Sequence, residues 1–143
     1  MNELIKLIDN NLEYITHEIT DSIIYIEVVS IRQVAKCPYC GSESDKVHSY
    51  YKKSFQDLPI QDHKVIVTIR NRKLFCNNPN CSKKTFAETF EILAPNAKKS
   101  IRLNNEIINI SMNVSSLAAE QIINNRIATV GKSTICNLIK KIK

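Results

Sequence analysis

Four of the five cysteines in this 143-residue chain form two closely spaced pairs. Cys37 and Cys40 enclose Pro-Tyr and precede Gly41, and Cys76 and Cys81 enclose Asn-Asn-Pro-Asn. Proline, glycine and asparagine are residues that tight turns favour. Two thiolates on one turn can bind one ion, and two such turns complete the tetrahedral shell that Zn²⁺ prefers. The spacing therefore predicts a zinc ribbon.

Two disulfides are the alternative use of the same four cysteines. Disulfides persist in oxidising compartments such as the cell exterior. The first nine residues lack the basic segment and unbroken apolar stretch of a secretory signal. No apolar run in the sequence approaches the roughly 20 residues that span a bilayer. We therefore expect a reduced, cytoplasmic protein without a membrane partner.

The predicted ligands of one structural Zn²⁺ are Cys37, Cys40, Cys76 and Cys81. Four thiolates close the shell, whereas a catalytic zinc usually keeps one position open. His48 lies between the pairs and would have to displace a thiolate, so we expect it outside the shell. Cys136 stands alone in a segment with helical periodicity and is expected to be a small core residue or to lie at the edge of the apolar stripe.

The cysteine pairs are embedded in segments that favour strands. Residues 22–30 are dense in β-branched and aromatic side chains and predict a strand that leads into the first cysteine turn. Residues 12–19 can pair with it as a hairpin, and residues 46–55 and 64–75 predict two further strands. We expect these last two to part over residues 56–61, because Pro59 cannot donate to a strand ladder.

Beyond Cys81 the apolar residues recur with the period of a helix. One helix is predicted from about residue 100 to 112 with Ser100 as its N-cap, and a second begins at Ser115 or Ser116. A third follows Gly131. Its apolar stripe consists of Ile135, Leu138, Ile139 and Ile142. A short helix, or an apolar cap on the sheet, is expected over residues 3–9.

The three C-terminal helices have the layout of a helix-turn-helix reader, with a plain three-helix bundle as the alternative. In the first reading, the third helix presents one group of side chains to bases and another to phosphates. The first group is Lys132, Ser133, Thr134 and Asn137, and the second includes Lys140 and Lys141. A second candidate for DNA contact is the basic ribbon surface around Arg70, Arg72 and Lys73.

Charge is distributed unevenly along the sequence. The net charge is −3 over residues 1–36, +3 over residues 37–91 and +6 over residues 92–143. A basic C-terminal part favours a polyanionic partner, because lysine and arginine release counterions from phosphates. A merely solvated basic surface is the alternative. No Gly-rich phosphate loop or catalytic triad is suggested, so we expect no enzymatic activity from this chain alone.

The ordered motifs resemble the N-terminal zinc-binding region of bacterial insertion-sequence transposases of the ISL-three family, over about residues 23–90. The resemblance is carried by Cys37-Pro-Tyr-Cys-Gly41, Val47-His-Ser-Tyr50, Asp57-Leu-Pro59, Arg72-Lys-Leu-Phe-Cys-Asn-Asn-Pro-Asn-Cys81 and Lys84-Thr-Phe-Ala-Glu88. It implies a helix-turn-helix segment after the ribbon and recognition of the terminal inverted repeats of a mobile element. It also implies a downstream catalytic domain of the DDE type, which the 143 residues do not include.

Together these features predict an α+β fold, in which a small antiparallel zinc ribbon with an N-terminal hairpin precedes a three-helix helix-turn-helix unit. The expected division is 1–36 for the N-terminal helix and hairpin, 37–91 for the ribbon, 92–99 for a connector and 100–143 for the DNA-binding segment. The predicted function is a non-catalytic transposase module that binds double-stranded DNA, with self-association or pairing with full-length transposase as further interactions. The alternative is a regulatory or protein-interaction factor built on a zinc ribbon.

Overall fold

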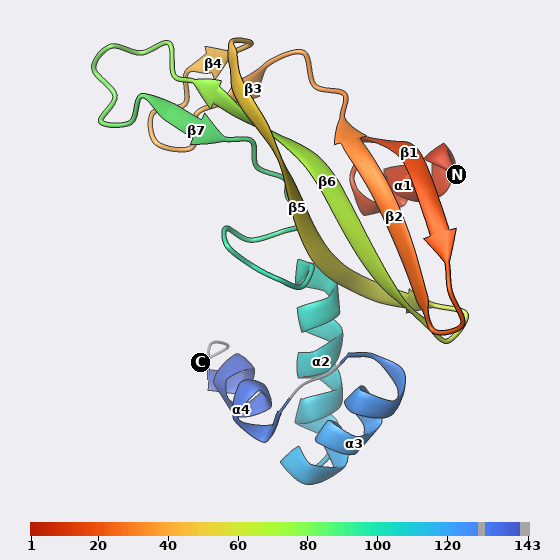
Figure 1. The fold of residues 1–143 in the computed structure, drawn as a ribbon. Helices are drawn as coiled ribbons and strands as arrows, with labels where there is room; N and C mark the ends of the chain where they lie inside the picture. Colours follow the sequence, from red (N-terminus) through yellow and green to blue (C-terminus); the bar gives the residue numbers. More distant parts are fainter. Residues whose placement is uncertain (129–130, 141–143) are drawn as a thin grey trace.

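The computed structural model describes residues 1–128 and 131–140. This part of the chain forms a mixed α+β structure with seven strands and four helices (Figure 1). None of these helices has the length and apolar character needed to cross a membrane. In chain order the elements are α1 (Asn2–Ile8), β1 (Leu12–Ile19), β2 (Ile23–Ser30), β3 (Ala35–Lys36), β4 (Glu43–Ser44), β5 (Val47–Ile60), β6 (His63–Phe75), β7 (Thr85–Ala87), α2 (Ile101–Asn113), α3 (Ser116–Arg126) and α4 (Lys132–Lys140).

Five strands form one sheet in the order β1-β2-β6-β5, with β7 paired to one end of β6. The β1–β2, β5–β6 and β6–β7 pairs are antiparallel, but β2 and β6 run parallel. The chain leaves β2 at the cysteine end, follows β5 to the far end and turns back along β6, so β2 and β6 point the same way (Figure 1). The expectation of a small antiparallel ribbon is therefore corrected, because the hairpin and the ribbon strands share one mixed sheet.

The long hairpin β5–β6 continues past the proline where the strands were expected to part. The pairing of Asp57 with Val65 is followed by that of Ile60 with His63, so the register shifts around Pro59. Proline has no backbone N–H to donate. Because Pro59 lies in this irregular stretch, the hydrogen bonds of the regular ladder are still formed. Gln61 and Asp62 form the turn itself, with positive φ angles of 50° and 63°. These angles are typical of a two-residue type I′ hairpin turn, whose twist matches that of the strands.

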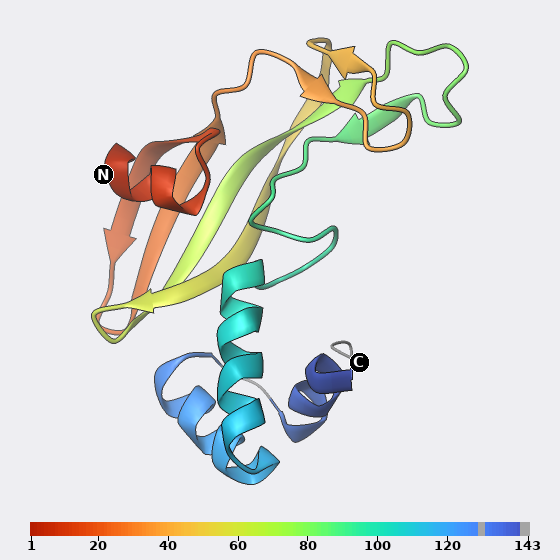
Figure 2. The ribbon, with the colours of Figure 1, turned by 180° about the vertical axis from the view of Figure 1, so that it is seen from behind.

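One face of the sheet carries the main hydrophobic core, which follows from the alternation of side chains along each strand. Val65, Val67 and Ile69 of β6 are buried there beside Phe55 of β5. Helix α1 covers part of this face and contributes Ile5, and residues 88–99 cover another part. Figure 2 shows α1 in front of β1 and β2. No helix of the described residues lies over the opposite face of the sheet in either view.

Helices α2, α3 and α4 pack around a second core. Its fully buried side chains are Leu103, Ile107, Ala119, Ile123, Ala128 and Ile135. The Ser100 hydroxyl accepts a hydrogen bond from Leu103 N at 3.2 Å, and that of Ser115 accepts one from Ala118 N at 3.2 Å. Both caps confirm the starts predicted for the first two C-terminal helices. Ile142, the last member of the predicted stripe, lies outside the described residues.

An ion pair with a buried carboxylate joins α2 to β5. The Asp57 carboxylate accepts hydrogen bonds from Ser100 Oγ at 2.7 Å and from Arg102 Nε at 2.8 Å, and Arg102 Nη2 bonds its second oxygen. Burial alone would raise the pKa of Asp57, but these bonds hold it below the ordinary value. Leu58, the next residue, packs into the helical core. The ion pair and the packing of Leu58 together attach the three helices to the far end of the long hairpin.

Candidate metal centre and basic surfaces

The first cysteine turn connects the short strands β3 and β4. Cys37 N donates to Ser42 O at 2.8 Å, and Gly41 N donates to Cys37 O at 2.8 Å. Gly41 has a φ of 80°, a left-handed conformation that glycine adopts without a Cβ penalty. The tight backbone places Cys37 and Cys40 on the same side of the turn.

The second cysteine turn follows β6. Cys76 N donates to Lys84 O at 2.8 Å, and Cys81 N donates to Asn78 O at 3.1 Å. The Asn77 side chain donates to Glu43 O at 2.9 Å and so ties this turn to β4 beside the first turn. The asparagines of the spacer therefore shape the second turn and hold it against the first.

The two turns bring all four paired cysteines together. Their Sγ atoms lie within 4.8 Å of one another. Cys37 and Cys81 are 4.0 Å apart at sulfur, and Cys40 and Cys76 are 3.5 Å apart. A tetrahedral ion with Zn–S bonds of about 2.3 Å requires sulfurs about 3.8 Å apart, whereas a disulfide requires about 2.0 Å. Cys37, Cys40, Cys76 and Cys81 form no disulfide in the described residues, so the donor set fits one structural Zn²⁺ rather than two disulfides.

The thiols differ strongly in acidity. Hydrogen bonds from the Ser42 hydroxyl and backbone lower the pKa of Cys40 to about 6. The Asn78 backbone lowers the pKa of Cys76, but burial and the neighbouring thiols raise it to about 12. One thiolate is thus favoured, while a second thiolate beside it is disfavoured without a compensating positive charge. Bound Zn²⁺ supplies that positive charge, which links metal binding to proton release and folding.

His48 lies outside this group. Its Nδ1 is hydrogen-bonded to Ser49 Oγ at 2.9 Å, and its ring meets the edge of Phe75 with centroids 5.0 Å apart. The candidate metal group in the described residues contains cysteines alone. Cys136, the remaining cysteine, lies half-buried in α4.

The three basic residues predicted to form the surface of the ribbon differ in their exposure and in their contacts. Arg70 and Lys73 are exposed, and Arg70 Nη2 lies 3.6 Å from Glu27 Oε1. The side chain of Arg72 is only 13% exposed and forms a bidentate pair with Glu88, with Nε 2.9 Å from Oε1 and Nη2 3.0 Å from Oε2. Arg72 is therefore held inside the fold, whereas Arg70 and Lys73 face solvent.

Glu88 is the centre of a buried polar cluster that was not predicted from the sequence. Its side chain is fully buried and also accepts a hydrogen bond from Ser30 Oγ at 2.6 Å. Arg32 Nη1 lies 3.4 Å from the same carboxylate. The cluster joins the end of β2 to β6 and to the chain after β7. Its members are far apart in sequence, so no local pattern could have revealed it.

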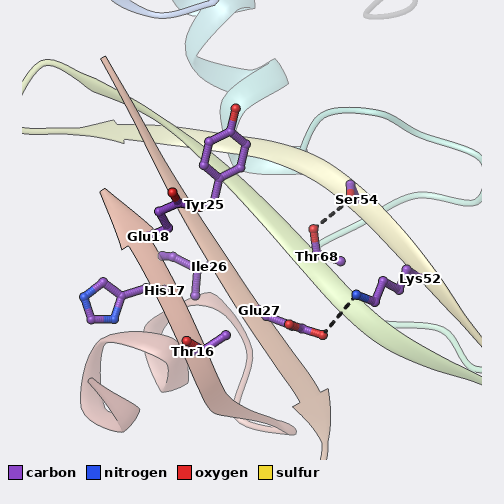
Figure 3. Close-up of a pocket in the computed structure, with 9 residues that line it drawn as sticks. All are labelled: Thr16, His17, Glu18, Tyr25, Ile26, Glu27, Lys52, Ser54 and Thr68. Atoms are coloured by element: carbon purple, nitrogen blue, oxygen red, sulfur yellow. Dashed lines mark hydrogen bonds and ion pairs between the residues drawn. The ribbon is translucent and has the colours of Figure 1, made fainter. Parts of the chain in front are cut away.

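A recess of about 600 Å³ lies on the open face of the sheet, lined by residues of β1, β2, β5 and β6 (Figure 3). Lys52 Nζ lies 3.8 Å from Glu27 Oε1 across it, and the hydroxyls of Ser54 and Thr68 are 2.8 Å apart. Glu18 adds a second carboxylate to the lining. Because two carboxylates and one lysine line it, this recess is a poor site for a polyanion.

Helix α4 presents the other predicted DNA-contacting residues. Ile135 is fully buried, while Thr134, Asn137 and Lys140 are exposed. This is the division expected when an apolar stripe faces the helical core. Lys132 and Ser133 form the start of the helix, and Lys141 lies outside the described residues.

Comparison with known proteins identifies the cysteine region. Residues 33–81 match the family model for the zinc-finger of transposase IS204/IS1001/IS1096/IS1165. No curated protein and no solved structure matches the chain. The matched segment contains both cysteine turns and the strands between them. It confirms the resemblance to the zinc-binding region of ISL-three transposases and identifies the segment as a transposase-type zinc ribbon with a structural Zn²⁺ site.

Proposed function

We propose that the chain is the zinc-stabilised DNA-binding part of a bacterial transposase, and that it recognises the terminal repeats of a mobile element without catalysing strand transfer. The observation that carries this proposal is the match of residues 33–81 to a transposase zinc finger whose four thiols fit one tetrahedral ion. On this proposal the protein acts in the bacterial cytoplasm, at the nucleoid when it is bound to DNA. It also self-associates or pairs with full-length transposase.

The proposed metal ligands are Cys37, Cys40, Cys76 and Cys81. Bound zinc closes the end of the ribbon by holding the two cysteine turns together, in addition to the Asn77–Glu43 hydrogen bond and the small apolar cluster beside them. It supplies stability there and takes no part in a reaction, because four thiolates leave no open coordination position. The fixed ribbon in turn holds the exposed Arg70 and Lys73 in place, with Arg72 and Glu88 behind them.

Helix α4 is the proposed reader of DNA. Its buried side faces α2 and α3, so Thr134 and Asn137 project away from the helical core. The start of a helix carries a partial positive charge that favours a phosphate. In this arrangement Lys132, Ser133, Thr134 and Asn137 contact bases and nearby phosphates, while Lys140 and Lys141 follow the DNA backbone.

The experiment is a fluorescence-anisotropy titration with Asn137→Ala. The duplex is one enriched from a random pool by the parent protein, and a scrambled version serves as comparison. The variant should bind the selected duplex about tenfold or more weakly and discriminate less between the two sequences, because an asparagine contact to a base contributes about 1–3 kcal/mol. Asn105→Ala, an exposed position on α2, is the matched control. Unchanged discrimination by the Asn137 variant would remove α4 as the reader.

A second candidate function is a protein-interaction or regulatory factor. It is favoured by an apolar groove of about 440 Å³ between α1, the β1–β2 hairpin and the end of β5. Leu4, Leu7 and Ile19 are exposed there, Leu7 by 72%. Salt separates the two functions, because DNA affinity falls steeply with salt while apolar docking responds weakly. Failure of the parent protein to bind any duplex at low salt would favour this second function.

A further inference from the structure

A second recess lies at the outer edge of β5 and shares Lys52 and Ser54 with the recess on the open sheet face. It has a volume of about 400 Å³ and lies between β5 residues 51–54 and the segment 96–98. Lys52, Lys53 and Lys98 contribute to its lining, and no described residue that lines it is acidic. A concave surface with one sign of charge concentrates an ion of the opposite sign.

The lysines of this recess differ in how they are neutralised. Lys52 Nζ lies 3.8 Å from Glu27 Oε1, so its positive charge has a nearby carboxylate. Neither Lys53 nor Lys98 is in a salt bridge within residues 1–128 and 131–140. Burial, and then the positive charge of Lys98, lower the pKa of Lys53. Two ammonium groups are thus held near each other without a carboxylate, an arrangement that an incoming anion would relieve.

Uncharged donors complete the lining. The Tyr51 hydroxyl oxygen accepts a hydrogen bond from Asn71 Nδ2 at 2.9 Å, and a phenol also carries one O–H donor. Asn96 has a φ of 60° and an exposed side chain at the opposite wall. Ammonium, phenol and amide groups all donate to the oxygens of a phosphate.

Gln56 connects this recess to the chain that enters α4. Its backbone N donates to Lys98 O and its O accepts from Ser100 N, each at 2.9 Å. Its side-chain amide donates to Ile127 O at 3.3 Å, just after α3. Both α4 and the loop before α2 lie on the side of the molecule away from α1 (Figure 1). A duplex on α4 therefore has its backbone on the same side as the recess.

We propose that this recess binds a phosphodiester of the DNA backbone as a second contact beside α4. The site rests on the proposed DNA-binding function and adds a contact in the sheet part of the chain. Lys53 and Lys98 neutralise the phosphate, and Tyr51 and Asn96 orient its oxygens. Because phosphate contacts carry no sequence information, the recess fixes the position of the duplex while α4 reads its bases.

The test uses the full chain with the substitutions Lys53→Gln and Lys98→Gln, singly and together. Binding to the selected duplex and to its scrambled version is measured by fluorescence anisotropy over several salt concentrations. Each single substitution should flatten the log–log salt slope by about one, and the double variant by about two. Affinity should fall by a similar factor, on the order of tenfold for the double variant, on both duplexes.

The matched controls are Lys6→Gln on α1, which removes one positive charge at the opposite edge of the sheet, and Lys98→Arg, which retains the charge. Both should keep the parent slope, and circular dichroism melting shows whether each variant is folded. A folded double variant with the parent slope overturns the phosphate site while α4 can remain the reader. Loss of affinity on the selected duplex alone also overturns it, because a backbone contact must weaken both sequences. A parent protein that binds no duplex overturns the proposed function itself.

Discussion

The two ends of the β5–β6 hairpin are stabilised in different ways. At the cysteine end, two turns meet through four thiols, and the small apolar cluster around Leu74 and Phe86 supports them. At the far end, three helices bury their own core and attach through Asp57 and Arg102. The first end depends on an ion, and the second depends on packing and on an ion pair whose carboxylate is buried. One β-hairpin can thus connect a part of the fold that is stabilised by a metal ion to a part that is stabilised by hydrophobic packing.

The largest expected effect is at the cysteine end, with Cys76→Ser. The loss of one thiolate should abolish stoichiometric zinc binding and unfold the ribbon tip, because metal binding contributes on the order of 10 kcal/mol to structural zinc sites of this size. Metal analysis by mass spectrometry and thermal melting measure both effects. Cys136→Ser and His48→Ala are the controls and should retain one zinc per chain. Full zinc in the Cys76 variant would contradict the four-cysteine site.

The second expected effect lies beside the cysteine end, with Glu88→Gln. This substitution leaves the Arg72 guanidinium mostly buried without its carboxylate, and breaking such a pair costs about 3–5 kcal/mol. Chemical denaturation should show that loss in the free energy of unfolding while zinc stoichiometry stays at one. Glu91→Gln, an exposed neighbour, is the matched control. Loss of zinc together with stability would mean that the metal centre depends on the Glu88–Arg72 ion pair.

The smallest effect is at the helical end, with Asp57→Asn. The hydrogen bonds from Arg102 and Ser100 lower the pKa of Asp57, so the carboxylate stabilises the fold at pH values above its unfolded pKa of about 3.9. That contribution is lost as the pH falls from about 4 toward the folded pKa. The expected cost at neutral pH is about 1–2 kcal/mol, since Arg102 is partly exposed.

The measurement for Asp57 is the unfolding free energy of parent and variant between pH 3 and pH 7. The difference between them should shrink as the pH falls below about 4. Asp45→Asn, an exposed site near β4, should follow the parent. A constant difference across the range would show that Asp57 acts through packing and not through its charge.

The sequence predicted the parts of this molecule that are governed by local rules. Cysteine spacing with Pro38 and Gly41 was enough for the metal centre, and the serines Ser100 and Ser115 marked two helix starts. Pro59 was misleading, because its effect depends on whether the ladder is regular at that point. The parallel pairing of β2 with β6 and the burial of Glu88 depend on contacts between distant segments. Neither leaves a periodic signal in one sequence.

The parallel pairing of β2 with β6 also bears on the order of folding. Between these two strands the chain must pass through the first cysteine turn and the whole of β5, so their pairing closes a long loop and is intrinsically slow. The β5–β6 hairpin is local and can form first. An early zinc ion would then hold the first cysteine turn against the end of β6 and shorten the loop that remains to be closed. Metal availability during synthesis would therefore set how fast the N-terminal hairpin docks, as well as how firmly it is held afterwards.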